Sequence, residues 1–192
     1  MPTALPFPRT VSTALLLALG VYFALSEIRI EWYASLRPFF EWMETTAFGR
    51  LGKSYGGAFA LVQAMHLLSM AVLGGTVLVS DARLMGIVLK NVPINQVLEP
   101  CHRLFNCSLS LVVLSGVFMA CGVAIKVYYL EVFWYKMLAL AMGVLFAYFV
   151  RRPLLKPSAE AVPQRLRTLV GVASLMTWFT VAATGRWIGF SG

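Results

Sequence analysis

Five long runs of apolar residues, separated by polar connections, dominate the pattern of this 192-residue chain. They cover residues 10–26, 57–80, 104–125, 132–150 and 169–190, and charged residues occur only in the last two, Lys136 in the fourth run and Arg186 in the fifth. About 20 apolar residues in a helix span the hydrocarbon of a bilayer. Helices also satisfy their own backbone hydrogen bonds there. The pattern therefore predicts an all-α transmembrane helical bundle of about five spans.

The first run differs from the other four because it is shorter. We interpret residues 1–37 as an N-terminal transmembrane anchor with its connection, and residues 38–192 as a four-helix transmembrane core. A signal peptide is the alternative for the first run, but Arg9 alone precedes it and no small-residue cleavage site follows. Residues 38–44 (PFFEWME) are predicted to form a short amphipathic helix at the membrane interface.

Composition supports lipid as the solvent of this chain. Hydrophobic residues make up 59% of it and charged residues 12%, about half the usual share in soluble domains. The net charge of +8 falls between the apolar runs, and no nucleic-acid-binding motif accompanies it. We therefore expect the bilayer, other membrane subunits or a second copy of the chain as partners, and no nucleic acid.

The basic residues also predict an orientation. The connection at residues 151–167 carries five basic residues, one acid and three prolines, so we expect a loop on the cytoplasmic side. Five spans would then leave the N-terminus cytoplasmic and the C-terminus external.

A short segment at the end of the second run contains Asp81 and Arg83, which are predicted to pair with neighbouring helices and fix their packing.

His66 is the most informative residue for function, because it lies well inside the second apolar run. Ionisable side chains within a membrane usually face a bundle interior or a functional cavity. One interpretation is an axial ligand to a b-type haem or to a metal ion. The other is a neutral histidine that is hydrogen-bonded to Ser69, Gln63 or a backbone carbonyl.

A second ligand to such a cofactor would have to come from another helix at the same depth. His102, the only other histidine, is predicted at the cytoplasmic start of the third span, roughly 21 Å of helix rise from His66. Met119 and Met142 lie closer in depth. A His/Met pair suits a haem of raised potential or Cu(I), and the alternative role for both methionines is flexible core packing.

Three cations gather near the predicted external face, namely Lys126, Lys136 and Arg186. Lys136 and Arg186 are candidates to pair with haem propionates, a quinone headgroup, an anionic lipid or a partner subunit. Snorkelling to the interface within an aromatic belt is the other explanation. The chain has no P-loop, HExxH or GxSxG motif, which argues against nucleotide-dependent and hydrolytic enzymes.

Five short motifs stand out in the chain, at residues 40–44 (FEWME), 63–68 (QAMHLL), 79–86 (VSDARLMG), 133–137 (FWYKM) and 185–188 (GRWI). They resemble a bacterial family of small multi-pass proteins, the DUF6644 type. The similarity covers about residues 38–190 and implies an inner-membrane protein with four core helices and no established activity. The second span also has a distant similarity to copper-resistance D-type proteins and to the membrane protoporphyrinogen oxidase of bacteria, which implies that His66 meets copper or haem.

These observations favour an inner-membrane, redox-associated subunit that binds a b-type haem. His66 is the expected axial ligand, Met119 or Met142 the candidate second ligand, and Lys136 and Arg186 the propionate partners. Two other functions remain open at this point: a non-catalytic accessory subunit of a larger membrane complex, and a copper-handling membrane protein with His66 as the metal ligand.

Overall fold

The computed structural model describes residues 15, 18–22, 25–26, 28–155 and 159–190, and this part of the chain is almost entirely helical. Most of the first predicted span, residues 10–26, lies outside the described residues. The helices are α2 (Ile28–Thr45), α3 (Ala47–Ser54), α4 (Gly56–Leu84), α5 (Ile94–Gly122), α6 (Ala124–Tyr129), α7 (Glu131–Leu145), the π-helix η1 (Phe146–Arg151), α8 (Arg152–Leu155), the 3-10 helix η2 (Ala159–Ala161) and α9 (Gln164–Ile188).

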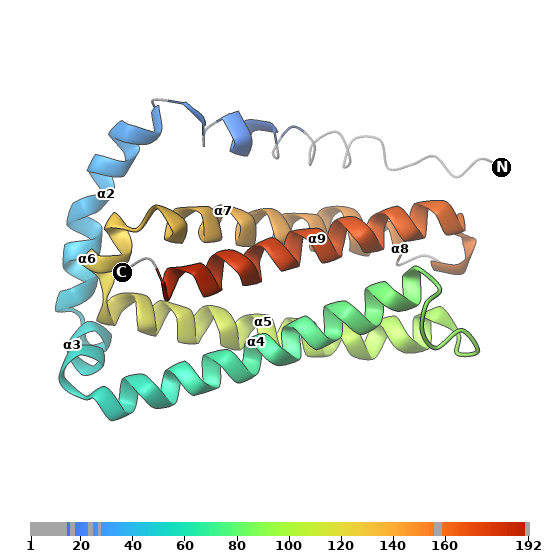
Figure 1. The fold of residues 1–192 in the computed structure, drawn as a ribbon, viewed down its shortest axis with the longest axis horizontal. Helices are drawn as coiled ribbons and strands as arrows, with labels where there is room; N and C mark the ends of the chain where they lie inside the picture. The colour runs from blue at the N-terminus through green and yellow to red at the C-terminus, as the bar shows by residue number, and fades with distance from the viewer. Residues whose placement is uncertain (1–14, 16–17, 23–24, 27, 156–158, 191–192) are drawn as a thin grey trace.

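Four long helices form an antiparallel bundle in which consecutive members run in opposite directions (Figure 1). They are α4, α5, the continuous segment Glu131–Leu155 and α9, and each is long and apolar enough to cross a membrane. Helix α4 packs on both α5 and α9, and α7 packs on α9. Outward-facing side chains such as Leu114 and Phe179 remain exposed and apolar, as a lipid-solvated surface requires. The predicted helical bundle is confirmed for these four spans.

The helix ends follow from local sequence. Pro93 and Pro163 directly precede α5 and α9, where a fixed φ suits the entry to a helix. At the end of α4, Gly86 adopts a φ of +74°, a left-handed conformation that glycine reaches without steric cost. The chain therefore turns back sharply after α4, and Ile87 N donates to Ala82 O.

Two predicted boundaries are wrong. Helix α5 begins at Ile94, ten residues before the predicted start, and contains Pro100. The predicted loop at residues 151–167 is helical at both ends, because η1 and α8 continue the third long helix to Leu155 and α9 begins at Gln164. Polar residues in these segments interrupted the apolar runs but did not interrupt the helices.

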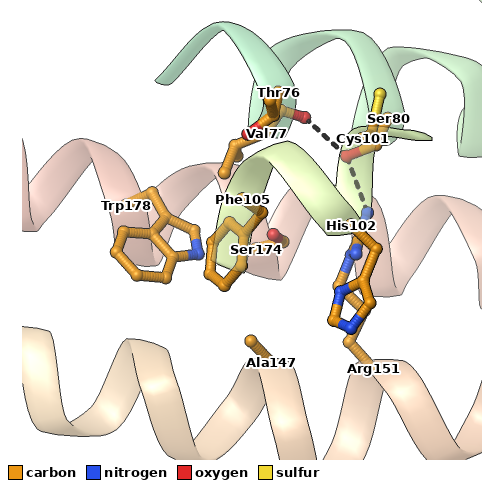
Figure 2. Close-up of a pocket in the computed structure, with 10 residues that line it drawn as sticks. All are labelled: Thr76, Val77, Ser80, Cys101, His102, Phe105, Ala147, Arg151, Ser174 and Trp178. Carbon is orange, nitrogen blue, oxygen red and sulfur yellow. Dashed lines mark hydrogen bonds between the residues drawn. The ribbon is translucent and has the colours of Figure 1, made fainter. Parts of the chain in front are cut away.

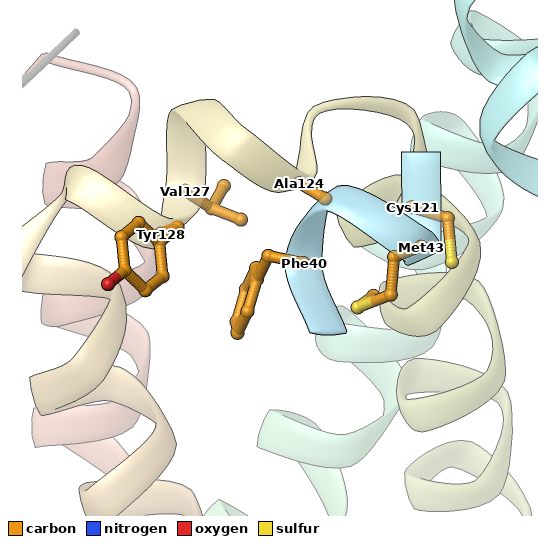
Figure 3. Packing of buried hydrophobic residues seen from close by; sticks show 6 residues of the cluster. All are labelled: Phe40, Met43, Cys121, Ala124, Val127 and Tyr128. Carbon is orange, nitrogen blue, oxygen red and sulfur yellow. The ribbon is translucent and has the colours of Figure 1, made fainter. Parts of the chain in front are cut away.

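A cap of three shorter helices, α2, α3 and α6, covers one end of the bundle (Figure 1). Residues 38–44, predicted as a short helix, are indeed helical and form part of the longer α2. Phe40 and Met43 of α2 pack with Cys121 of α5 and Tyr128 of α6 in one buried cluster (Figure 3). Tyr33 and Tyr128 also exchange hydrogen bonds, each hydroxyl donating to the other residue's carbonyl at 2.7 and 2.8 Å. The cap is thus tied to the bundle by aromatic packing.

Candidate functional site

His66 lies in α4 and is 7% exposed, between the middle of the bundle and the end covered by the cap. Its Nδ1 lies 2.8 Å from Ser115 Oγ of α5. A Cβ on the neighbouring Gly116 would stand 3.4 Å from the Cε1 atom of the His66 ring, so this glycine lets α5 approach the imidazole closely. His66 is therefore held against one face of α5.

The hydrogen bonds around Ser115 favour one tautomer of His66. The Ser115 hydroxyl has one hydrogen, and its geometry directs this to the carbonyl of Leu111 one turn earlier. With that assignment, Nδ1 of His66 donates to Ser115 Oγ. A neutral imidazole with its proton on Nδ1 keeps a lone pair on Nε2, and this is the state in which histidine coordinates a metal.

Lys136 of α7 lies close enough to His66 for their charges to interact. It is half-buried, and its ammonium end packs against Gly185 of α9, where a Cβ would stand 3.5 Å from Nζ. Within the described ranges, no acid forms an ion pair with Lys136. The site therefore combines one imidazole lone pair with one cation that has no counter-ion.

The other candidate residues, Met119, Met142 and Arg186, lie on α5, α7 and α9. Met119 lies one turn beyond Ser115 on the same face of α5, and Met142 lies on α7 six residues after Lys136. Arg186 is exposed in the last turn of α9, and its guanidinium lies 4.5 Å from the centre of the Phe190 ring. The end of the Lys136 side chain packs against Gly185, and Arg186 is the next residue in α9. These two cations therefore lie at the same end of the bundle.

His102 does not lie at the start of its helix, as the sequence predicted. It lies in the third turn of α5, where it lines a cavity between helices. His66 contacts α5 at Ser115, 13 residues further along, which corresponds to roughly 20 Å of helix rise. The expectation that the two histidines cannot share one iron therefore agrees with this spacing.

The cavity beside His102 belongs to a second polar site at the uncapped end of the bundle. Asp81 of α4 is completely buried, and Arg151 of η1 donates to its Oδ1 from Nε at 3.0 Å and from the terminal Nη2 at 2.8 Å. Nη2 also lies 2.8 Å from Ser80 Oγ, and Figure 2 shows this hydrogen bond dashed. The predicted pairing of the segment around Asp81 with a neighbouring helix is thus observed.

The cavity itself has a volume of about 20 Å³. It is lined by hydroxyl, thiol, imidazole and guanidinium groups together with apolar side chains. These residues come from α4, α5, η1 and α9 and are Thr76, Val77, Ser80, Cys101, His102, Phe105, Ala147, Arg151, Ser174 and Trp178.

A third polar contact joins the three helices of the cap to one another. Glu44 of α2 forms an ion pair with Lys53 through Oε2 and accepts a hydrogen bond from the backbone N–H of Ile125 through Oε1 at 3.0 Å. The hydrogen bond from Lys53 is the main cause that lowers the pKa of Glu44, and the bond from Ile125 adds to it. Burial acts in the opposite direction.

Sequence reasoning missed the partner of Asp81 and the cavity. Arg151 is 70 residues from Asp81 in the chain, and it was expected in a loop. Its position at the end of the fourth apolar run, directly followed by Arg152, gave no local sign that it points inward. The one available signal was the buried acid itself, because a carboxylate in lipid requires a partner.

The fold and these sites define a class, the multi-pass helical membrane proteins that carry polar groups inside an apolar bundle. A comparison with protein-family models identifies the family: the chain belongs to the family of unknown function DUF6644, whose model matches residues 39–191. Comparisons with curated proteins and with solved structures give no match.

Proposed function

We propose that this protein is a redox-associated membrane subunit that binds a b-type haem through Nε2 of His66. The observation that carries the proposal is the pairing of an imidazole lone pair with an uncompensated cation inside the membrane. A b-type haem offers both complementary groups, an iron for the imidazole and propionates for an ammonium. Arg186 is the second candidate partner for a propionate.

The residues around His66 support this cofactor by their chemistry. Ser115 orients the ring and favours its tautomer, as outer-shell partners of metal-binding histidines do. Met119 and Met142 are the candidates for a second ligand, and a thioether ligand would raise the potential of the iron. When bound, the haem would supply one-electron transfer, while the protein provides the ligand, the charge partners and an environment without bulk water.

Copper handling is the weaker alternative at the same site. Nearby Lys136 disfavours a bare cation at His66, because like charges repel strongly where no water screens them. The same ammonium favours a ligand that carries carboxylates. The position of Lys136 therefore favours haem over Cu(I).

The decisive experiment is a reduced-minus-oxidised absorbance spectrum of the protein purified in mild detergent from cells supplied with haem precursors. The proposal predicts a b-type spectrum that is lost in His66→Ala and retained in Gln63→Ala, a variant of an exposed polar residue on the same helix. Met119→Leu and Met142→Leu should separate the two candidate second ligands.

A flat spectrum from folded wild-type protein would overturn the proposal and favour the accessory-subunit alternative. So would a spectrum lost on His102→Ala but unchanged in His66→Ala. Metal analysis of the same samples covers the copper alternative, since stoichiometric copper that disappears in His66→Ala would replace haem as the assignment.

The orientation of the molecule is part of the same proposal. The segments 83–103 and 151–167 carry eight of the 16 Lys and Arg residues of the chain, and the turns within them lie at the same end of the bundle, opposite the cap (Figure 1). This basic end supports the proposal that it faces the cytoplasm of a bacterial cell and that the cap faces the external side of the inner membrane. His66 then lies nearer the external side.

A further inference from the structure

We propose that the buried Asp81–Arg151 pair is a proton-binding site, in which the Asp81 carboxylate takes up and releases a proton by way of the Ser174 hydroxyl and a water molecule held in the neighbouring cavity. This inference does not depend on haem, because the cavity lies at the end of the bundle away from His66.

The contacts of the carboxylate are one-sided. Both hydrogen bonds from Arg151 end on the same oxygen, Oδ1, in place of the two-oxygen fork that arginine usually forms with a carboxylate. Asp81 Oδ2 is buried and has no hydrogen-bond partner among the described residues. The Ser174 hydroxyl lies near this carboxylate, and an oxygen in this position either carries a proton or requires a donor such as a nearby hydroxyl.

The neighbouring cavity can hold a water molecule close to this acid. Its volume of about 20 Å³ exceeds the roughly 10–15 Å³ that one water molecule requires. Asp81 itself does not line the cavity, but Ser80, Arg151 and Ser174 do, and all three lie around the carboxylate. Three polar neighbours are the usual number for a buried water. The cavity therefore suits a single water molecule that reaches the carboxylate by way of Ser174.

His102 gives the site a second titratable group that leads away from Asp81. It lines the same cavity and is only half-buried. Tyr148 donates to Asn106 Oδ1 at 2.7 Å, and the Asn106 amide nitrogen lies 3.4 Å from His102 Nε2. With Nε2 accepting from Asn106, neutral His102 carries its proton on Nδ1. His102, Asn106 and Tyr148 thus form a polar group beside the cavity, which begins near the depth of Asp81 and extends toward the middle of the bundle.

The proton balance of the step is simple. A proton from the aqueous side at the uncapped end passes by way of His102, the water and the Ser174 hydroxyl to the Asp81 carboxylate, which becomes a neutral carboxylic acid, and it returns by the same route. No electron moves, and no bond other than O–H and N–H forms or breaks. Buried acid and histidine pairs of this kind mark proton relays in membrane proteins.

Each element packed around Asp81 contributes charged or titratable groups, or uncharged ones, to its surroundings. Arg151 of η1 favours the carboxylate form, and Cys101 and His102 lie beside it on α5. Arg152 of α8 acts on His102. Helix α9 contributes Ser174 and Gly171, which are uncharged, and Arg167 lies one turn before Gly171. Uptake of a proton by Asp81 therefore changes the charge balance of the whole cluster.

Infrared difference spectroscopy of the full chain in lipid vesicles, titrated over pH, tests the proposal. The wild type should show the carbonyl stretch of a protonated carboxylic acid that appears as pH falls and is lost in Asp81→Asn. Glu99→Gln is the matched control, because Glu99 is exposed and paired only with Arg103, and it should retain the band. Identical spectra in wild type and Asp81→Asn at every pH would overturn the proposal.

A second variant keeps the test decisive if Asp81→Asn fails to fold. His102→Gln leaves the carboxylate in place but removes the neighbouring titratable group. It should preserve the carboxylic acid band, shift its midpoint and slow its appearance after a pH jump. A midpoint and rate equal to those of the wild type would remove His102 from the proton path. Measurement on haem-free protein separates this result from the outcome at His66.

Discussion

At the scale of single residues, the cost of burying charge in an apolar bundle explains the most consequential contacts. Asp81 is fully buried, and the Arg151 side chain is 17% exposed, so each is the other's main compensation. Removing one partner of a buried ion pair leaves the other charge without compensation, which costs more than the pair itself contributes. This asymmetry gives a direct prediction.

Arg151→Met should lower the free energy of unfolding by about 3–5 kcal/mol, because it strands the Asp81 carboxylate. The double variant Asp81→Asn, Arg151→Met should recover much of that loss, since no unpaired charge remains. Arg103→Met, in an exposed pair with Glu99, is the control and should change stability little. Unfolding curves in detergent provide the measurement, and a loss equal to that of Arg103→Met would contradict the account.

Glu44 predicts a pH dependence whose sign follows from its environment. Its folded-state pKa is lower than the ordinary value of 4.5, chiefly because Lys53 donates to it. The stability it contributes is therefore fully present above pH 4.5 and is lost as pH falls through the lowered folded-state pKa. Glu44→Gln should flatten this part of the melting temperature against pH curve. An unchanged acid limb would show that Glu44 does not hold the helices of the cap together.

The sequence predicted residues of this kind unevenly, for a physical reason. His66 could be recognised because it interrupts a long apolar run, and interruptions are visible without a structure. The partners of His66 and Asp81 could not be recognised, because Ser115 and Arg151 are 49 and 70 residues away and satisfy them through helix packing. Pairing across a bundle depends on rotation of each helix, which hydropathy does not encode.

At the scale of elements, the bundle was predictable and its ends were not. The central parts of all four long helices agree with the apolar runs, since lipid solvation dictates their length. The first ten residues of α5 contain Glu99, Pro100 and Arg103, which look like a connection in sequence but form helix beyond the apolar core. The same holds for Arg151 and Arg152 after α7. These helices are therefore longer than the apolar runs within them.

The cap gives a prediction at this scale. Tyr128 is 2% exposed and makes both packing and hydrogen-bond contacts with α2, so Tyr128→Ala should cost about 3–5 kcal/mol. Its neighbour Tyr129 is 57% exposed, and Tyr129→Ala should cost far less. Hydrogen exchange should show that α2 loses protection in Tyr128→Ala while α4 and α5 keep theirs. Uniform loss across all helices would mean that the cap is not a separate element.

At the scale of the whole molecule, the two polar sites are separated along the bundle. His66 and Lys136 lie toward the capped end, and Asp81, Arg151 and His102 lie toward the other end. Under the two proposals above, an electron carrier would lie toward one membrane face and a proton-binding acid toward the other, which is the arrangement that a subunit coupling the two requires. The arrangement requires the orientation proposed above.

Cysteine labelling tests that orientation. In a background with Cys101, Cys107 and Cys121 replaced by serine, Lys126→Cys in the cap should react with an impermeant maleimide in intact spheroplasts. Lys90→Cys, in the turn between α4 and α5, should react only after the membrane is opened. The reverse pattern would invert the molecule and place its basic turns outside.

Lipid solvates the outside of this bundle, and its buried polar groups therefore act within a membrane. Alkaline carbonate extraction of membranes from cells that produce the full chain tests this most directly. Because its surface is apolar, the protein should stay in the membrane pellet and leave it only with detergent. Recovery of folded protein in the carbonate supernatant would contradict it.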